Sequence, residues 1–324
     1  MDQIWGSMAQ YTKIIWPWEI AIYLFLAGLS AGALISAVLV KWRCNNNHQA
    51  DGIIKAGALL ACPSISIGLG LLILDLGKPL TFWMLMVYFN LHSVMSLGVI
   101  LLSVYSLLTA IFALVVFQDE LLNSDLVGWA VKPLLPVVRV FEQFGKIFDW
   151  IMLVCAVCIA AYTGFLLSVL VAKPLMNGAA LPLLFLVSGI SSGIAASIIT
   201  SIVLFKQKVQ QTNLKFLAGI DGKLVPMELV ILFAMFVGMF NMGGHYAVVA
   251  EQALTIGIWA KVFWLGVIGL GLMAPLIISA SLHRYESNAG LVMPTGKLLL
   301  NCGLVLTGVV LLRFYILYAG QIFF

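Results

Sequence analysis

Charge is what this chain has least of. Asp, Glu, Lys and Arg together make up only 9% of its 324 residues, against about 25% in an average soluble domain. Hydrophobic residues reach 63%, and the mean hydropathy is +1.11. These values exclude an ordinary soluble protein and predict one that crosses a membrane several times.

Cysteine is also scarce. The five cysteines, Cys44, Cys62, Cys155, Cys158 and Cys302, form neither a disulfide framework nor the spacing of a four-ligand metal site. Cys155 and Cys158 lie three residues apart and share a helix face, which in an apolar span usually means packing. We therefore expect no metal bound by this chain.

Long apolar runs are abundant. About twenty apolar residues cross the hydrocarbon core as a helix, and only helices or closed barrels satisfy their backbone groups there. The sequence predicts an all-α integral membrane protein with eight transmembrane helices: 18–40, 54–74, 91–117, 150–170, 182–205, 227–242, 259–282 and 297–318. The sixth is short and ends in NMGGH (241–245), so we expect it to break or bend inside the bilayer.

Basic residues are concentrated in every second loop. The loops after spans one, three, five and seven hold twelve of the seventeen Lys and Arg residues: Lys41, Arg43, Lys55, Lys132, Arg139, Lys146, Lys206, Lys208, Lys215, Lys223, Arg284 and Lys297. By the positive-inside rule both termini then face the periplasm of a bacterium. Arg313 lies near the end of the last span, where we expect it to snorkel outward.

The net charge of +4 is thus taken up by topology. It says little else. From its spans we expect a multi-pass protein of the bacterial inner (cytoplasmic) membrane, with the lipid bilayer as its surroundings and no nucleic-acid partner. The first span is too long for a signal h-region and is expected to be retained. In the longest connection, 118–149, mixed acids and apolar residues favour a helix lying at the cytoplasmic interface.

A pattern of small residues occurs twice. GLSAG (28–32) with Ser36 aligns with GISSG (189–193) and Ser197 at a constant offset of 161 residues. The copies lie four helices apart, in the first and fifth spans, so the fold is predicted to be two four-helix bundles related by a parallel repeat. Chance similarity among small residues is the alternative. The predicted units are 1–148 (first three helices and the cytoplasmic loop), 149–181 (fourth helix and a periplasmic loop) and 182–324 (second half).

Ionisable side chains stand at the ends of two predicted spans. Glu19 and Tyr23 are one turn apart at the periplasmic end of the first span, and Asp75 closes the second. A carboxylate in such a place is usually retained for a partner, an ion or a proton path. These residues predict a functional face on the periplasmic side.

Further polar side chains lie at the same predicted depth. His92 opens the third span, Tyr162 lies in the outer half of the fourth, and Asn241 and His245 lie at the outer end of the sixth. The cytoplasmic side offers mainly Glu228. We expect Asn241, His245 and Glu228 to be additional polar sites.

This set of side chains suits a carrier of two electrons and two protons, such as a quinone. Its head needs hydrogen-bond partners for two oxygens, an apolar slot for the ring, and an ionisable group that exchanges protons with water. Simpler interpretations stay open. Tyr23 fits an interfacial belt, His92 fits a bonded structural histidine, and Asp75 fits a pair with Lys78.

Three stretches carry a family resemblance. WEIAIYLFLAGLSAG (18–32), LDLGKP (74–79) and AYTGFLLS (161–168) occur in this order and resemble the NrfD family, to which the membrane subunit of polysulfide reductase belongs. The similarity extends over the whole chain in helix number and order. No motif alone is a catalytic fingerprint.

The resemblance implies a membrane anchor, without haem or metal of its own, that exchanges electrons between menaquinol and an attached iron-sulfur subunit. That ferredoxin-like, four-cluster subunit would lie on the periplasmic face. It would pass electrons to a molybdopterin catalytic subunit acting on polysulfide, thiosulfate, tetrathionate or a similar acceptor. The membrane anchor itself would perform only the quinol chemistry.

The resemblance also implies a head-group site. The family's Asn and His on the first helix fall at Ile20 and Tyr23 here, so Glu19 and Tyr23 would replace that pair. Tyr162 matches the family's Tyr on the fourth helix. The expected proton-transfer groups are Asp75, Glu19 and His92.

Two other classes stay open. A secondary transporter with a polar site between two helical repeats also suits eight helices, although its site should lie near the midplane. A cytochrome b type anchor needs facing pairs of haem-ligating histidines, and only His92 and His245 could approach each other.

Overall fold

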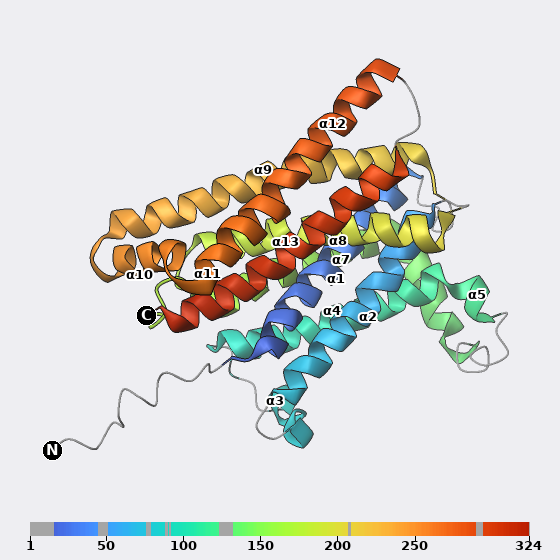
Figure 1. The fold of residues 1–324 in the computed structure, drawn as a ribbon. Helices are drawn as coiled ribbons and strands as arrows, with labels where there is room; N and C mark the ends of the chain where they lie inside the picture. Colours follow the sequence, from blue (N-terminus) through green and yellow to red (C-terminus); the bar gives the residue numbers. More distant parts are fainter. Residues whose placement is uncertain are drawn as a thin grey trace.

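The structure is a computed structural model that describes residues 16–44, 51–75, 79–87, 90, 92–122, 132–206, 209–289 and 294–323. Helices and their connections account for all of these residues, and no strand occurs among them. The fold is drawn in Figure 1.

Besides helices, the described residues form short 3-10 turns at Pro79–Thr81 and Lys132–Leu134. The helices are α1 (Trp18–Arg43), α2 (Gly52–Leu74), α3 (Met84–Val87), α4 (Val94–Val116), α5 (Gln118–Leu122), α7 (Leu135–Ser168), α8 (Ala180–Leu204), α9 (Gln211–Met242), α10 (Gly244–Thr255), α11 (Gly257–Lys261), the π-helical segment η5 (Val262–Met273), α12 (Ala274–Ala289) and α13 (Thr295–Ile322).

Eight helices among the described residues are long and apolar enough to cross a membrane. They are α1, α2, α4, the part of α7 from Gln143, α8, α9, the continuous helix Gly257–Ser281, and α13. The prediction of an all-α protein with eight spans is therefore confirmed.

Local chemistry sets several helix ends. The carboxylate of Asp51 caps α2 by accepting a hydrogen bond from the backbone N–H of Ile53 at 2.9 Å. Asp51 also accepts one from Asn213 Nδ2 at 2.6 Å, which ties the start of α2 to the start of α9. At Gly243 the backbone adopts a φ of 66°, a conformation that glycine adopts most readily, and there α9 ends.

The sixth span differs from its prediction. Instead of a short helix, α9 runs for 32 residues from Gln211 to Met242 with Pro226 inside it. The predicted interruption at 241–245 is present, because α9 ends at Met242 and α10 begins at Gly244; its depth in the bilayer stays a prediction. The apolar run is interrupted by Asp221 and Lys223, and for this reason the sequence suggested a later start. The helix continues because the side chain of Asp221 is buried against α8 and accepts a hydrogen bond there.

The fourth and seventh spans are also more irregular than predicted. Gly145 has a φ of 37° and a ψ of −105°, so it kinks α7 between a first segment and the membrane span. The helix predicted in 118–149 exists as α5 and this first segment of α7; its placement at the interface stays a prediction. The seventh span contains the π-helical turns of η5.

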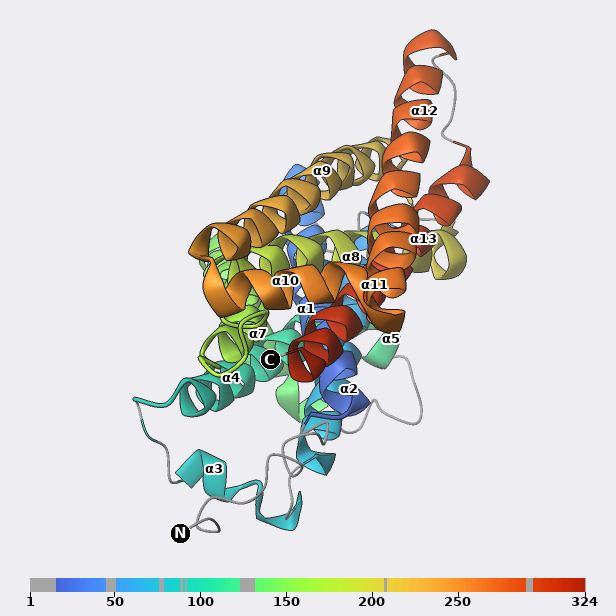
Figure 2. The same cartoon turned by 60° about the vertical axis from the view of Figure 1, so that its left-hand side comes forward.

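The eight spans form two rings of four helices (Figures 1 and 2). In the first, α1 packs on α2, α2 on α4, α4 on α7, and α7 on α1. In the second, α8 packs on α9, α9 on α12, α12 on α13, and α13 on α8. The two rings are joined most extensively along α1 and α8.

Matched positions of the two small-residue patterns meet at this junction. Gly28 lies against Gly189, and the hydroxyl of Ser36 donates to that of Ser197 at 2.9 Å. Because contacts at both ends of the pattern keep the same offset of 161 residues, α1 and α8 run parallel. A parallel repeat requires this packing; the repeat itself and the predicted unit boundaries stay predictions.

The start of α1 and the end of α13 lie on one side of the bundle, which we call the termini side (Figure 1). The side-chain amide of Gln321 and the backbone of Trp16 exchange hydrogen bonds of 2.8 and 3.1 Å. The start of α1 and the end of α13 are thereby joined. The assignment of this side to the periplasm stays a prediction.

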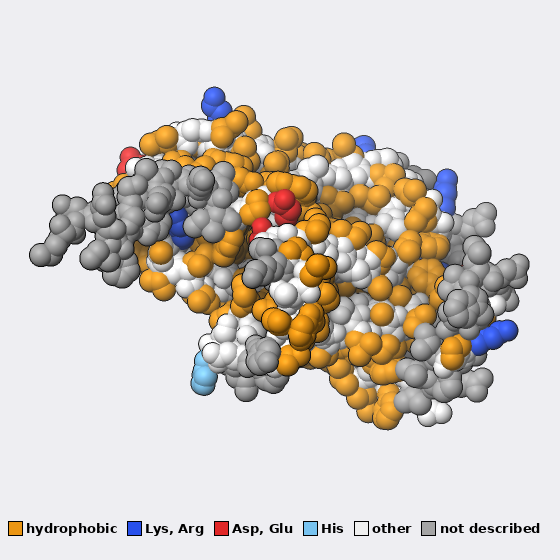
Figure 3. All heavy atoms as spheres, turned by 90° about the horizontal axis from the view of Figure 1, so that it is seen from below, with side chains coloured by type: hydrophobic (Ala, Val, Ile, Leu, Met, Phe, Trp, Pro, Cys, Tyr) orange, Lys and Arg blue, Asp and Glu red, His pale blue; other side chains and the backbone are white. Residues whose placement is uncertain are grey.

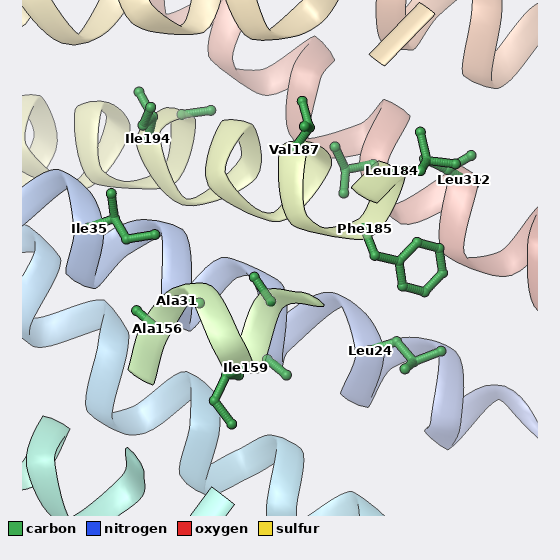
Figure 4. Close-up of a cluster of buried hydrophobic side chains, with 14 of the residues drawn as sticks. Leu24, Ala31, Ile35, Ala156, Ile159, Leu184, Phe185, Val187, Ile194 and Leu312 are labelled. Carbon is green, nitrogen blue, oxygen red and sulfur yellow. The ribbon is translucent and has the colours of Figure 1, made fainter. Parts of the chain in front are cut away.

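The interior is apolar and so is much of the outside. Buried side chains from α1, α7, α8 and α13, such as Leu24, Ile159, Phe185 and Leu312, interdigitate at the junction of the two rings (Figure 4). On the face seen in Figure 3, apolar side chains dominate and charged ones are few. Such a surface is suited to lipid.

Candidate functional site

Four of the predicted site residues come together at the termini side, and we call them the acid–tyrosine cluster: Glu19, Tyr23, Asp75 and Tyr162. Glu19 and Tyr23 are four residues apart on α1, so their side chains share a helix face. Glu19 interacts electrostatically with Asp75 at the end of α2. Tyr162, from the last turns of α7, interacts in the same way with Tyr23.

The cluster contains two buried polar atoms with no hydrogen-bond partner among the described residues. They are the hydroxyl of Tyr23, whose side chain is fully buried, and Oε2 of Glu19. Leaving a buried polar group unpaired costs about 1–3 kcal/mol. A phenol can donate and a carboxylate can accept, so these two atoms suit a ligand that carries hydroxyl or carbonyl oxygens.

Asp75 forms the exposed edge of the cluster. It caps the C-terminal end of α2, and its pKa is raised by partial desolvation and, to a smaller extent, by the negative charge of Glu19. A carboxyl group in this position holds a proton more readily than an ordinary aspartate and still reaches water. Lys78, the alternative partner, lies outside the described residues.

The other predicted residues on this side lie at the surface. His92 is exposed two residues before α4 begins, and its backbone N–H donates to Asn90 Oδ1 at 3.0 Å. Asn241 and His245 are exposed on either side of the turn between α9 and α10, in the second ring. All three side chains are therefore exposed, whereas the hydroxyl of Tyr23 is buried.

Glu228 belongs to a second group of buried side chains, which we call the acid–arginine cluster: Ser191, Asp221, Glu228 and Arg313. The hydroxyl of Ser191 donates to Asp221 Oδ1 at 2.6 Å, and Glu228 interacts electrostatically with Asp221 and Arg313. None of the four is more than 2% exposed. Glu228 thus lies inside α9 and not at the cytoplasmic surface, because α9 begins seventeen residues before it.

Arg313 does not snorkel outward as predicted; it is fully buried. Its Nη2 donates to Ser188 Oγ at 2.8 Å and to the carbonyl of Phe185 at 3.2 Å, and its guanidinium stacks 3.7 Å from the centre of the Phe185 ring. The carboxyl group of Glu228 interacts electrostatically with this guanidinium and supplies the opposite charge. Nε and Nη1 of Arg313 and Oε1 of Glu228 have no hydrogen-bond partner among the described residues.

Arg313 of the acid–arginine cluster reaches α1, the helix that carries Glu19 and Tyr23. A methyl group at Gly28 would lie 3.5 Å from Nη2 of Arg313, so the guanidinium reaches from the second ring to the backbone of the first. Gly28 follows Tyr23 by five residues on α1, or about 7.5 Å along the helix axis. The small residue at position 28 makes this approach of Arg313 possible.

Sequence reasoning overlooked Asp221 and Arg313, although two signals were present. Asp221 and Glu228 are seven residues apart, a spacing that places both on one face of a helix. Arg313 interrupts a span that is otherwise apolar, which by itself marks a functional candidate. Assigning Asp221 to a loop and Arg313 to the interface concealed both signals.

No group of three or more His, Cys, Asp or Glu side chains within the described ranges is arranged to hold a metal ion. In the acid–tyrosine cluster, the ring of Tyr23 lies against Gly68 of α2 and the phenol of Tyr162 against Gly98 of α4. The role of this cluster in ligand binding stays a prediction.

Comparison with known proteins decides the family. The model of the polysulphide reductase family, NrfD, matches residues 6–324. The chain belongs to the NrfD family. This NrfD-family protein, with its eight spans, is accordingly a multi-pass bacterial membrane protein.

Relatives of this NrfD-family protein include subunits of several oxidoreductases. It is 46% identical to the C subunit of polysulfide reductase from Wolinella succinogenes, over all of its own length and 99% of the relative. It is 37% identical to the protein NrfD of Escherichia coli, over 98% of both sequences. A more distant relative, 25% identical over 95% of this sequence and 71% of its own length, is the Hdr-like menaquinol oxidoreductase integral membrane subunit of Archaeoglobus fulgidus.

Proposed function

We propose that this protein is the membrane subunit of a respiratory oxidoreductase and that it oxidises menaquinol at the acid–tyrosine cluster. The observation that carries the proposal is the buried hydroxyl of Tyr23, without a partner among the described residues and beside Tyr162. The names of two relatives, a polysulfide reductase subunit and a menaquinol oxidoreductase subunit, support the same class of reaction.

The chemistry assigns a role to each member of the cluster. Oxidation of a quinol to a quinone releases two electrons and two protons. Tyr23 and Tyr162 hold the two oxygens of the head by hydrogen bonds. Glu19 accepts the protons, and Asp75, at the exposed edge, passes them to water.

The electrons leave to an iron-sulfur cluster in an attached subunit. We place that four-cluster, ferredoxin-like subunit on the termini side, which we assign to the periplasm because most Lys and Arg residues lie in the loops at the opposite end. The exposed apolar side chains of Trp83, Met86 and Val87, between α2 and α4, offer it a docking surface. A molybdopterin subunit would bind beyond it and reduce the terminal acceptor.

The acid–arginine cluster gives the same fold a second place that can hold protons. Because Arg313 lies beside α1, the cluster is positioned to pass protons between the cytoplasmic half of the second ring and the quinol site. Oxidation that releases protons only to the periplasm would be electroneutral. A contribution from Glu228 and Asp221 would make it electrogenic.

A secondary transporter is the second candidate. One observation favours it: the acid–arginine cluster is buried within the spans at the junction of the two rings, where transporters bind their substrates. Family membership and the position of the acid–tyrosine cluster at the helix ends favour the respiratory subunit.

Purification of the protein with its bound partners from native membranes separates the two candidates. The quantities to measure are the iron and molybdenum contents of the purified complex and the rate at which it oxidises a water-soluble naphthoquinol. The proposal predicts iron, molybdenum and turnover in one complex. A protein that purifies without iron-containing partners and drives solute uptake in proteoliposomes would contradict it.

A further inference from the structure

The two tyrosines of the acid–tyrosine cluster each lie against a glycine on a neighbouring helix. The ring of Tyr23 lies on Gly68 of α2, where an added Cβ would be 3.4 Å from Cδ2 of the ring. The phenol of Tyr162 crosses from α7 to α4 and lies on Gly98. Both glycines are buried within their helices.

The two contacts differ in how close they are. An added Cβ at Gly68 would make an ordinary van der Waals contact with the ring of Tyr23. At Gly98 the added Cβ would overlap the hydroxyl oxygen and Cζ of Tyr162. The tip of the Tyr162 phenol therefore occupies the space that the side chain of any other residue at position 98 would need.

Glycine at position 98 needs a reason, because alanine is the more favourable residue in the interior of a helix. Gly70, on α2, has no atom within 4 Å of an added Cβ, so its environment would accept a side chain. The environment of Gly98 would not, since protein interiors are close-packed and the phenol could not remain where it is.

We propose that Gly98 is a positioning residue for the quinol head: it fixes the depth and direction of the Tyr162 hydroxyl and makes α4 one wall of the head-group site. This inference rests on the proposed function of the acid–tyrosine cluster. The hydroxyl of Tyr162 is held on one side by the backbone of α4 and has the unpartnered hydroxyl of Tyr23 within electrostatic range. A ligand oxygen then meets a phenol whose position is already set.

Such positioning matters because hydrogen bonds and reacting groups tolerate little displacement. A donor and acceptor oxygen pair best at about 2.7–2.8 Å, and a misplacement of about 1 Å can reduce a rate by about a hundredfold. A methyl group at position 98 displaces the Tyr162 hydroxyl by a distance of this order.

The test compares three glycine-to-alanine variants in the assembled complex, with a naphthoquinol as the reduced substrate. Gly98→Ala is expected to lower kcat/KM by at least about tenfold, and Gly68→Ala by less than about threefold because the contact there is ordinary. Gly70→Ala is the matched control and should behave as the unaltered protein. Equal values for Gly98→Ala and Gly70→Ala would overturn the inference.

A double-variant cycle distinguishes positioning from general damage to packing. If Gly98 acts through the hydroxyl of Tyr162, then Gly98→Ala should reduce kcat/KM far less in a Tyr162→Phe background than in the unaltered protein. An equal reduction in both backgrounds means that Gly98 is only a packing residue. If Tyr162→Phe alone keeps full turnover, the proposed quinol site fails, and the role of Gly98 fails with it.

A second variant covers the case in which Gly98→Ala does not accumulate in the membrane. Tyr162→Leu in the same protein removes the phenol tip that the new methyl group would overlap. Restored accumulation of the double variant supports the contact between Gly98 and Tyr162. Absence of restoration overturns it.

Discussion

The two polar clusters lie in corresponding halves of the molecule but differ in their access to solvent. The acid–tyrosine cluster stands at the helix ends, with Asp75 exposed and Glu19 half-buried. In the acid–arginine cluster, no more than 2% of the surface is exposed for Asp221, Glu228 or Arg313. The first can exchange protons with water directly, whereas the second keeps charged groups inside only because acids and a guanidinium compensate one another.

The corresponding serines show the same difference. Ser30 of α1 shares a hydrogen bond of 3.0 Å with the hydroxyl of Tyr105, a neutral partner. Its match in the second half, Ser191, donates to the carboxylate of Asp221. One position in the repeated sequence pattern thus bonds to a phenol in one half and to an acid in the other.

The largest effect is expected when the charge balance of the acid–arginine cluster is broken. Arg313→Met leaves Glu228 and Asp221 buried without their countercharge, which should cost about 3–5 kcal/mol of folding stability. The thermal unfolding midpoint of the purified protein measures the loss. Arg43→Met, which removes an exposed guanidinium, is the control. Equal midpoints for the two variants would show that the buried charges are not coupled.

The next effect is on turnover and concerns only the acid–tyrosine cluster. Tyr162→Phe removes one proposed partner of the quinol head, and we expect quinol oxidation by the assembled complex to fall by about tenfold or more. Tyr105→Phe is the control. It removes another buried tyrosine hydroxyl from the first ring of helices and should leave turnover unchanged. Similar turnover in the two variants would mean that Tyr162 has no special role in quinol oxidation.

A smaller effect is expected on the pH dependence of the reaction. The raised pKa of Asp75 means that this carboxyl is protonated at a higher pH than an ordinary aspartate, and a protonated carboxyl cannot accept a proton from the quinol. Turnover should therefore fall on the acidic side as pH drops through that pKa. Asp75→Asn should slow the reaction and flatten this acidic limb. If the acidic side of the pH dependence is unchanged in Asp75→Asn, a group other than Asp75 causes the fall in turnover.

The smallest effect is expected at the junction between the two rings. Ser36→Ala removes the hydrogen bond to Ser197 and should lower the free energy of unfolding by about 1 kcal/mol, without a change in quinol turnover. Ser103→Ala, whose hydroxyl bonds to the carbonyl of Val99 within its own helix, is the matched control. Chemical unfolding of the two variants measures the difference, and a turnover defect in Ser36→Ala would link the junction to the reaction.

Much of the fold could be predicted because apolar run length alone identifies a membrane span. All eight spans follow from it, as does the end of α9 at Met242. The start of α9 could not be predicted in this way, because the run breaks at Asp221 and only tertiary burial of that acid lets the helix continue. The kink at Gly145, where φ is 37°, and the helix α10 were not predicted either.

The candidate site was predictable in part for a related reason. Glu19 and Tyr23 are linked by helical spacing, and Asp75 by its position at a span end, so the sequence indicated one depth for all three. His92 met the same criterion of depth, but the structure leaves it exposed. The sequence carried no signal for the contact of Arg313 with α1, because that contact depends on how the two rings pack.

The most direct test of a quinol site at the acid–tyrosine cluster measures both quinol oxidation and the thermal unfolding midpoint of Tyr23→Phe. The Tyr23 hydroxyl is buried without a partner among the described residues, so its removal should leave the unfolding midpoint unchanged or higher, while quinol oxidation falls by about tenfold or more. Tyr105→Phe should lower the unfolding midpoint and leave quinol oxidation unchanged, because the hydroxyl of Tyr105 is bonded to Ser30. Full turnover in Tyr23→Phe, or a loss that merely follows a lower midpoint, would contradict a quinol site at this cluster.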